Sequence, residues 1–388
     1  MAVPRQELLY ISPVIPAVTG SGLAMRAGTT LEALSEHYAV SLLVVRLYPG
    51  VTSEIPREIR RLCRRALVTD PARPGILDRF RLRLAAATRW RNVPFAVVHA
   101  FRLATLPFAQ PFFAATVAPP RRWLDLDALD SDRHCRIADL CRSNGDLPLA
   151  AFEEQEARRS QTLEDEAWPG LDRVFVCSPE ERERIVRRAR VEVRVLPNAV
   201  RLPAQSVTPA APDAFRFLFM GTLGYYPNDD AGLYLCREIV PRLRERLAPP
   251  FEVQIVGGGA TGRLREAAAA SGVRLAGAVP SVDPFYRKAD AVLAPLRAGG
   301  GSRVKVLEAF SYRRPVVATT VGAEGLDARH ERELLIGDSP DEFAAACARL
   351  VEDRELSLRL AESAFRLVEQ SYSVAALRHM LEPAERAG

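Results

Sequence analysis

The sequence predicts an α/β protein with two doubly wound, Rossmann-like domains. Short apolar runs alternate with amphipathic helical segments along the whole chain, which is the pattern of parallel sheets joined by crossover helices. The chain has 388 residues, too many for most single hydrophobic cores, so two domains are expected. The stretch 194-RVLPNAVRLPAQSVTPAAPDA-214 is rich in proline, lacks periodicity and is expected to link the two halves.

In the first half, the expected strands are apolar runs bounded by turn residues. A helical pattern over 23–37 separates the first two, and Ser178 with Pro179 has the properties of a helix N-cap. The second half repeats this alternation and ends in an amphipathic helix expected over 341–370. The expected strands are 8–12, 40–45, 95–100, 173–178, 215–221, 251–257, 273–279, 289–296 and 315–320.

Composition limits the class of protein. The hydrophobic fraction is 48% and the charged fraction 26%, as in ordinary globular proteins. No apolar run reaches the roughly 20 residues of a transmembrane helix, and the N-terminus lacks signal-peptide features, so a cytoplasmic protein is expected. The six cysteines form no C-x-x-C pair and are expected to be reduced thiols; a metal site at His134, Cys135 and Cys141 is the less favoured alternative.

Arginine is concentrated between Arg57 and Arg91, where eleven arginines face only three acids. Two solvated helix faces are the favoured interpretation of this segment. A surface for anionic lipid, which would make the protein peripheral at the inner face of a membrane, or for an anionic acceptor is the alternative. No nucleic-acid-binding motif accompanies the charge, so a nucleic-acid partner is not expected.

Glycine clusters follow several of the expected strands. Ligands of open α/β sheets bind beyond the carboxyl ends of the strands, so these loops are candidate sites, with a cleft expected between the domains. One cluster is followed by Arg303, Lys305 and then Glu308, which predicts an anion site because glycines let backbone N–H groups approach closely. The clusters are Gly20-Ser21-Gly22, Gly221-Thr222-Leu223-Gly224, Gly257-Gly258-Gly259 and Gly299-Gly300-Gly301.

Two common nucleotide sites are disfavoured. In 19-TGSGLAM-25 the third glycine of a dinucleotide fingerprint is replaced by Met25, and the second strand ends at Val45-Arg46 without an acid for a ribose. No G-x-x-x-x-G-K-[ST] sequence is present, which excludes a P-loop. The other candidate is a sugar nucleotide, whose diphosphate would be the anion.

The run GGGSRVKVLEAFSYRRPVVATTVGAEGL, which begins at Gly299, strongly resembles retaining glycosyltransferases of family 4, which have the GT-B fold. Within that family it resembles the subgroup with the donor motif GGG-S/T-R-x-K-x-L-E-A. FMGTLGYYPNDDA (219–231), IVGGG (255–259), GAVPSVDPFYRKADAVLAPL (277–296) and the hinge-like LPNAV support the resemblance, in the family's order and spacing. The first half matches more weakly, through YISPVIPAVTGSG and VVHAFR.

The resemblance implies an organisation and a reaction. An N-terminal acceptor-binding domain over 1–195 and a linker over 196–214 would precede a donor-binding domain over 215–370, with a C-terminal helix over 371–388 packing back on the first domain. A UDP- or GDP-sugar would be the co-substrate, with no prosthetic group and no metal. Its sugar would pass to a hydroxyl of a glycan, lipid-linked or small-molecule acceptor, by front-side attack in which the leaving phosphate takes the acceptor's proton.

The resemblance also implies which residues bind the donor. Arg303 and Lys305 would hold the diphosphate as catalytic residues, and Glu308 would accept hydrogen bonds from ribose hydroxyls. The implied donor-binding residues are Gly221, Thr222, Gly257, Gly258, Val279, Gly299, Gly300, Gly301, Ser302, Arg303, Lys305, Val306, Leu307 and Glu308.

In the first half, Gly20, Ser21 and Gly22 resemble the family's glycine-rich loop and are expected to bind the acceptor. His99 is a candidate for contact with the sugar, with a buried structural histidine as the alternative. Asp127 is a candidate for acceptor or sugar contact. Its alternatives are a structural acid and, through Asp125-x-Asp127, a metal-binding DxD pair.

The sequence departs from the family at two places. Many members have a glutamate where this chain has Gly300, so the sugar would be recognised through backbone amides around 299–302. The segment 221-GTLGYYPNDDAG-232 also lacks the arginine and lysine that many members have there. A sugar-nucleotide epimerase on the same fold and a non-catalytic glycosyltransferase-like partner therefore remain as alternatives.

Overall fold

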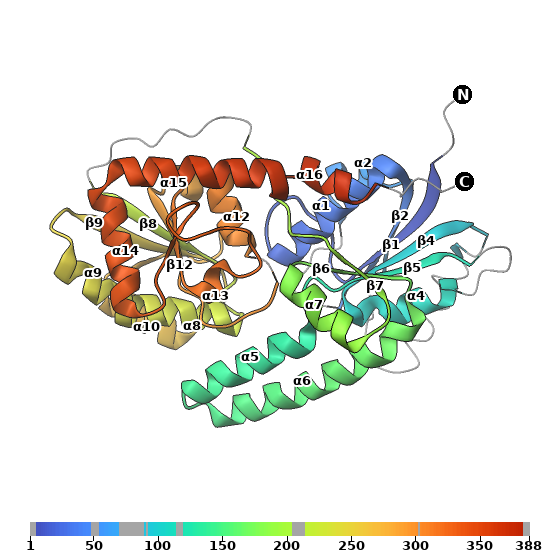
Figure 1. Cartoon of the computed structure of the whole chain (residues 1–388), viewed down its shortest axis with the longest axis horizontal. Helices are drawn as coiled ribbons and strands as arrows, with labels where there is room; N and C mark the ends of the chain where they lie inside the picture. The colour runs from blue at the N-terminus through green and yellow to red at the C-terminus, as the bar shows by residue number, and fades with distance from the viewer. Residues whose placement is uncertain are drawn as a thin grey trace. The chain divides into compact units, whose positions relative to one another are not determined.

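The computed structural model describes residues 5–47, 54–69, 89–90, 92–113, 119–203, 214–301 and 303–382. The chain divides into two compact units, and each contains one parallel sheet covered by helices, which confirms the predicted fold class (Figure 1). Unit 1 consists of Met1–Ser131, Arg158–Asn198 and Val374–Gly388, and unit 2 of Asp132–Ala157 and Ala199–Ser373. Unlike the predicted domains, unit 2 includes the tip of a helical hairpin from the first half of the chain.

Unit 1 has a seven-stranded parallel sheet in the order β3-β2-β1-β4-β5-β6-β7. The strand order reverses at β1, where Leu9 lies between Ser41 of β2 and Val98 of β4. Ligands of doubly wound sheets bind at such a reversal, beyond the carboxyl ends of the strands. The strands are β1 (Gln6–Ser12), β2 (Tyr38–Val45), β3 (Arg65–Thr69), β4 (Phe95–Phe101), β5 (Arg121–Asp125), β6 (Arg173–Val176) and β7 (Glu192–Val195).

The helices of unit 1 cover this sheet and bury a core that includes Leu9, Val98, Leu124 and Val174. The last helix packs against the first, and Arg378 donates to Glu32 at 3.0 Å. The helices are α1 (Gly22–His37), α2 (Arg57–Leu62), α4 (Leu106–Phe113), α7 (Pro179–Arg188) and α16 (Val374–Met380), with short 3₁₀ turns η1 (Leu103–Thr105) and η2 (Trp168–Gly170). The hairpin helices α5 (Asp130–Ser143) and α6 (Leu147–Ala167) belong partly to each unit.

Unit 2 has a six-stranded parallel sheet in the order β10-β9-β8-β11-β12-β13, so its strand order reverses between β8 and β11. Strand β8 pairs with both neighbours, with Phe219 opposite Ile255 of β9 and Leu293 of β11. The strands are β8 (Phe215–Met220), β9 (Phe251–Val256), β10 (Arg274–Leu275), β11 (Ala291–Ala294), β12 (Val316–Ala318) and β13 (Leu335–Ile336).

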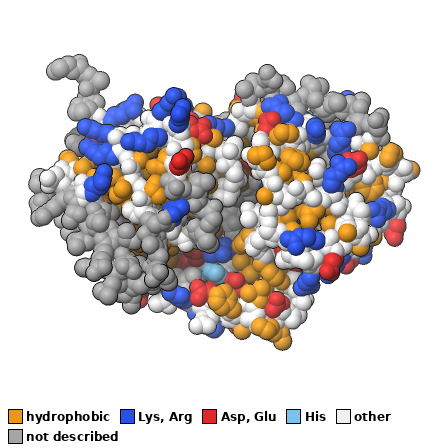
Figure 2. All heavy atoms as spheres, turned by 180° about the vertical axis from the view of Figure 1, so that it is seen from behind, with side chains coloured by type: hydrophobic (Ala, Val, Ile, Leu, Met, Phe, Trp, Pro, Cys, Tyr) orange, Lys and Arg blue, Asp and Glu red, His pale blue; other side chains and the backbone are white. Residues whose placement is uncertain are grey.

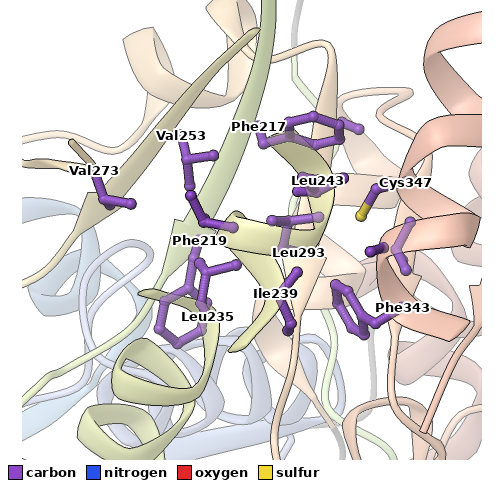
Figure 3. Packing of buried hydrophobic residues seen from close by; sticks show 14 of the residues in the cluster. Phe217, Phe219, Leu235, Ile239, Leu243, Val253, Val273, Leu293, Phe343 and Cys347 are labelled. Atoms are coloured by element: carbon purple, nitrogen blue, oxygen red, sulfur yellow. The ribbon is translucent and has the colours of Figure 1, made fainter. Parts of the chain in front are cut away.

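The core of unit 2 joins this sheet to helices on its faces. Figure 3 shows Phe219 and Leu293 of the sheet with Leu235, Ile239 and Phe343 from the helices around it. The helices are α8 (Tyr226–Tyr234), α9 (Val240–Arg246), α10 (Gly262–Ala270), α11 (Asp283–Lys288), α12 (Val304–Ser311), α13 (Thr320–Ala323), α14 (Pro340–Glu352) and α15 (Arg354–Leu367), with π-helical turns η3 (Leu235–Ile239) and η4 (Val368–Tyr372).

Two expectations about helices are wrong. Residues 65–69 of the arginine-rich segment form the edge strand β3, not a helix face, because they pair in register with β2. The helix expected over 341–370 is broken at Asp353, which ends α14 and caps α15 by accepting from the N–H of Leu356 at 2.9 Å. Residues 70–88 and 91 of the arginine-rich segment lie outside the described residues.

No described helix is long and apolar enough to cross a membrane. Figure 2 shows one face of the molecule, on which basic side chains gather at the upper left with acidic side chains among them.

Candidate functional site

The glycine-rich loops after β8 and β9 of unit 2 pack directly against each other. Gly257 has a φ of +154°, and a Cβ there would lie 1.7 Å from the carbonyl oxygen of Gly221. At Gly259, a Cβ would lie 2.7 Å from the backbone nitrogen of Gly224. These glycines are therefore required by the close approach of two loops, whatever ligand lies beside them.

Lys305 extends from the first turn of α12 toward the loop after β8. Its Nζ donates to Oδ1 of Asn228 at 2.6 Å and lies 4.8 Å from the centre of the Phe219 ring. Burial, with the nearby charge of Arg303, lowers the pKa of Lys305 to about 7, while Glu308 acts in the opposite direction. The ammonium is thus a partly desolvated cation, held at the point where the sheet order of unit 2 reverses.

Glu308 lies one turn further along α12. Its Oε2 accepts a hydrogen bond from the hydroxyl of Tyr286 at 3.0 Å, and the Tyr286 ring stacks on Tyr312 with centroids 5.1 Å apart. Burial raises the pKa of Glu308 to about 7, although Tyr286 and Lys305 favour its charged form. The carboxyl group is therefore held in a fixed orientation, as a residue that recognises hydroxyl groups requires.

The structure gives Arg303 contacts that the sequence did not predict. Its Nη1 donates to the carbonyl of Gly300 and its Nε to the carbonyl of Val321, both at 2.9 Å. Its Nη2 lies 3.6 Å from Glu324, and the side chain is only 6% exposed. In this arrangement Arg303 holds the glycine loop together, and its expected contact with the diphosphate stays a prediction.

Arg136 is a residue that sequence reasoning missed. It comes from α5 of the hairpin and donates to both carboxylate oxygens of Glu324, with Nη2 2.7 Å from Oε1. Its Nη1 also lies 3.4 Å from the carbonyl of Gly299. Arg136 lies on a polar helix, 163 positions from Gly299. Nothing in the sequence around it indicates that it reaches the triple-glycine loop.

The remaining implied donor residues are less informative. Val306 and Leu307 have fully buried side chains, and their backbone N–H groups donate to the carbonyl of Arg303. Thr222 is exposed, its carbonyl accepting from Asn228 at 2.9 Å, and Gly258 and Val279 are partly exposed in loops. Ser302 lies outside the described residues.

In unit 1, the implied acceptor loop is exposed at the start of α1. Gly20, Ser21 and Gly22 are all exposed, and Ser21 caps the helix by accepting from the N–H of Ala24 at 3.3 Å. Gly20 has a φ of +113°, a conformation that side-chain-bearing residues rarely adopt.

A buried ion pair lies at the carboxyl end of β5, whose last residue is Asp125. Arg26 of α1 donates through Nη2 to Asp125 at 2.6 Å, and both side chains are almost completely buried. Asp127, with a φ of +63°, accepts from Cys177 at 3.2 Å and Asn198 at 3.3 Å. Asp125 is buried and paired with Arg26, whereas the side chain of Asp127 is partly exposed.

His99 lies within β4, enclosed by aromatic rings. It stacks on Phe175 with centroids 5.4 Å apart and meets Tyr10 and Trp123 edge-on. Burial, together with Arg26 and Arg173, lowers the pKa of His99 to about 3. The neutral ring is completely buried, so a contact with the sugar would require these aromatic residues to move.

Among the described residues, no cluster of three or more His, Cys, Asp or Glu side chains could hold a metal ion. His134 instead interacts with Glu153 at 2.5 Å, and the described cysteines form no disulfide.

Comparison of the structure with solved structures identifies the fold. The chain resembles solved structures of a sucrose-phosphate synthase from Thermosynechococcus elongatus (16% identity, 97% of both chains, TM-score 0.73) and of Alr3699/HepE from Anabaena in complex with UDP and glucose (14% identity, 97% of this chain and 98% of that one, TM-score 0.70). A glycosyltransferase from Rickettsia africae is similar at 11% identity, 97% and 96% coverage and a TM-score of 0.67. These likenesses show the fold, which is GT-B.

Residues 214–353 match the family model described as glycosyl transferases group 1. No curated protein matches the sequence. The matched domain contains the glycine loops, Lys305 and Glu308, and with the fold it supports the assignment of the protein as a glycosyltransferase enzyme.

Proposed function

We propose that the protein is a retaining glycosyltransferase that transfers a sugar from a nucleoside-diphosphate sugar to an acceptor hydroxyl. The observation that carries this proposal is the pair formed by Lys305 and Glu308 on α12. One is a desolvated cation beside a glycine-rich loop, and the other is a fixed carboxyl group one turn away. The cation would pair with the diphosphate of the donor, and the carboxyl group would accept hydrogen bonds from its ribose hydroxyls.

The proposed reaction needs no protein nucleophile. As the bond between the anomeric carbon and the phosphate oxygen breaks, Lys305 and the amides of the glycine loop stabilise the negative charge that develops on the diphosphate. The acceptor oxygen attacks from the same face, and its proton passes to the leaving phosphate oxygen. The stereochemistry of the sugar is thereby retained.

The donor is proposed to be a UDP- or GDP-sugar. The solved Anabaena structure contains UDP and glucose, which is consistent with this choice for a protein of the same fold. Unit 2 would bind the donor, and unit 1 the acceptor through Gly20, Ser21 and Gly22. Asp127 is proposed to contact a hydroxyl of the acceptor or of the sugar, because it is the partly exposed carboxylate at the carboxyl end of β5.

For the arginine-rich segment, a solvated surface remains our proposal. Arg64 and Arg65 both pair with Glu7, at 2.6 and 3.1 Å, so their charge is partly neutralised within unit 1. Co-sedimentation with anionic vesicles is expected to be no greater than with neutral vesicles. A marked preference for anionic vesicles would instead favour a lipid-linked acceptor.

Calorimetric titration with UDP, GDP, ADP and TDP tests the donor site. One diphosphate is expected to bind to the wild type, with or without EDTA, and binding should be lost in Lys305→Ala. Lys288→Ala is the matched control, because Lys288 is an exposed lysine of the same unit. Tight nucleotide binding without turnover on any acceptor would favour a non-catalytic partner, and conversion of the donor alone into a new sugar nucleotide would favour an epimerase.

A further inference from the structure

The carbonyl groups of the triple-glycine loop are held by two arginines from different elements. Arg136 of α5 reaches the carbonyl of Gly299, and Arg303 donates to the carbonyl of Gly300. Both guanidinium groups also lie beside the carboxylate of Glu324, which follows α13. Three segments of unit 2 that are distant in sequence thus meet at one short loop.

This arrangement determines which way the loop's amides point. In a trans peptide, the carbonyl of one residue and the N–H of the next point in opposite directions. Fixing the carbonyls of Gly299 and Gly300 toward the arginines therefore directs the N–H groups of Gly300 and Gly301 to the other side of the loop. Those N–H groups are the ones that an anion can reach.

The loop is shaped for these arginines as well as for a ligand. Gly299 has a φ of +133°, and a Cβ there would lie 3.1 Å from Nη1 of Arg303. A side chain at this position would therefore press on the guanidinium and strain the backbone. The glycine permits the contact between loop and arginine, in addition to any close approach by phosphate.

We propose that Arg136 is a positioning residue for the diphosphate: with Glu324 and Arg303, it fixes the glycine loop with its amides preorganised for binding. The proposal rests on the proposed function, in which this loop is the diphosphate site. Arg136 does not touch the ligand. It acts through the loop, so it contributes to the affinity for the diphosphate and not to that for the nucleoside.

The experiment is calorimetric titration of the full chain with UDP and, separately, with uridine, or with GDP and guanosine if the wild type prefers guanine. The variants are Arg136→Ala, Glu324→Gln and the two combined. Arg142→Ala is the matched control, because Arg142 lies on the same helix and pairs with Asp139 and Glu154 of the hairpin itself. Thermal unfolding of each variant is measured alongside.

Arg136→Ala is expected to raise the Kd for the diphosphate about tenfold, as the loss of one charge-assisted hydrogen bond would, and to leave nucleoside binding unchanged. The double variant should bind the diphosphate no more weakly than the weaker-binding of the two single variants, because both changes break the same Arg136–Glu324 ion pair. In turnover assays the KM for the donor should rise more than kcat falls, and Arg142→Ala should match the wild type.

Two results would overturn the proposal. Diphosphate binding by Arg136→Ala within about twofold of the wild type would show that the loop needs no such support. An equal loss for diphosphate and nucleoside would show that the whole domain is disturbed. If the wild type itself binds none of the four diphosphates, it is the proposed function that fails, and this inference fails with it.

Discussion

At the scale of single residues, the proposed donor site contains ionisable groups that are held away from water. Burial brings the pKa of Lys305 down to about 7 and that of Glu308 up to about 7. Both groups therefore change charge near neutral pH, where ordinary lysines and glutamates do not. A diphosphate placed beside Lys305 favours the charged ammonium, so its binding should be coupled to protonation.

The first prediction concerns this coupling. Below about pH 7 the free Lys305 is already charged, and above it binding must add a proton, so UDP affinity should fall as the pH rises from about 7 to about 9. Calorimetry in two buffers with different ionisation enthalpies measures the proton uptake directly. Lys288→Ala, which leaves Lys305 in place, should show the same proton uptake as the wild type. A pH-independent affinity over this range would place Lys305 away from the diphosphate.

The second prediction concerns Asn228, which accepts the hydrogen bond from Lys305 and donates to the carbonyl of Thr222. In Asn228→Asp, a carboxylate would face the ammonium and raise the pKa of Lys305. The fall in UDP affinity should then begin at a higher pH than in the wild type. The control is Asn228→Ala, which removes the hydrogen bond without adding a charge and in which the fall should not move to a higher pH. An unchanged pH profile in Asn228→Asp would contradict the contact.

These residues differ in how well the sequence could reveal them. Lys305 and Glu308 follow the triple glycine within one short motif, so a single segment indicated both. Asn228 lies 77 positions from Lys305 and Arg136 lies 163 positions from Gly299, so only the fold brings these pairs together. For Arg303, the sequence suggested the diphosphate contact and gave no sign of the contacts within the loop. A cation beside glycines suggests phosphate, whereas here the loop's own carbonyls and Glu324 surround it.

At the scale of elements, the strands that were predicted are mainly the inner ones. Strands β1, β2 and β4 are buried on both faces and appear in the sequence as continuous apolar runs. Strands β3 and β7, the two edges of the sheet of unit 1, were missed because they carry arginine and glutamate, and the inner strand β5 was missed because it begins with two arginines and is short. Charged edge strands prevent unwanted pairing, and the same charge removes the apolar signal.

A single capping side chain can determine where a helix begins, and the third prediction concerns such a cap. Asp353→Ala removes the N-cap of α15 and should lower the free energy of unfolding by about 1 kcal/mol. Glu352→Ala, at the exposed end of α14, is the control and should change it by less than about 0.5 kcal/mol. Urea unfolding followed by circular dichroism measures both. Equal stabilities of the two variants would show that the break between the helices does not depend on the cap.

At the scale of the whole molecule, the two units have separate cores, and the strands at the centre of their sheets follow the same order. In each, the first strand lies between the second and the fourth of its own sheet, and the candidate residues follow the strands at that reversal. The apolar alternation along the chain indicated this architecture. The assignment of the hairpin tip to unit 2 was not indicated, because it depends on contacts between residues far apart in the sequence, such as Asn144 with Asp230 and the apolar cluster of Ile137 and Cys141 with Tyr226.

The last prediction follows from this division. If the donor site lies wholly within unit 2, UDP should stabilise the native state of that unit by about 2.7 kcal/mol at a hundredfold excess over Kd. Amide hydrogen exchange should then slow in the loops after β8 and β11 and in α12, where the diphosphate and ribose would bind. The strands of unit 1 should exchange at the same rate with and without UDP, and Lys305→Ala should show no protection anywhere. Protection confined to the loops of unit 1 would move the nucleotide site there, and would contradict the assignment of Lys305 and Glu308 to the donor.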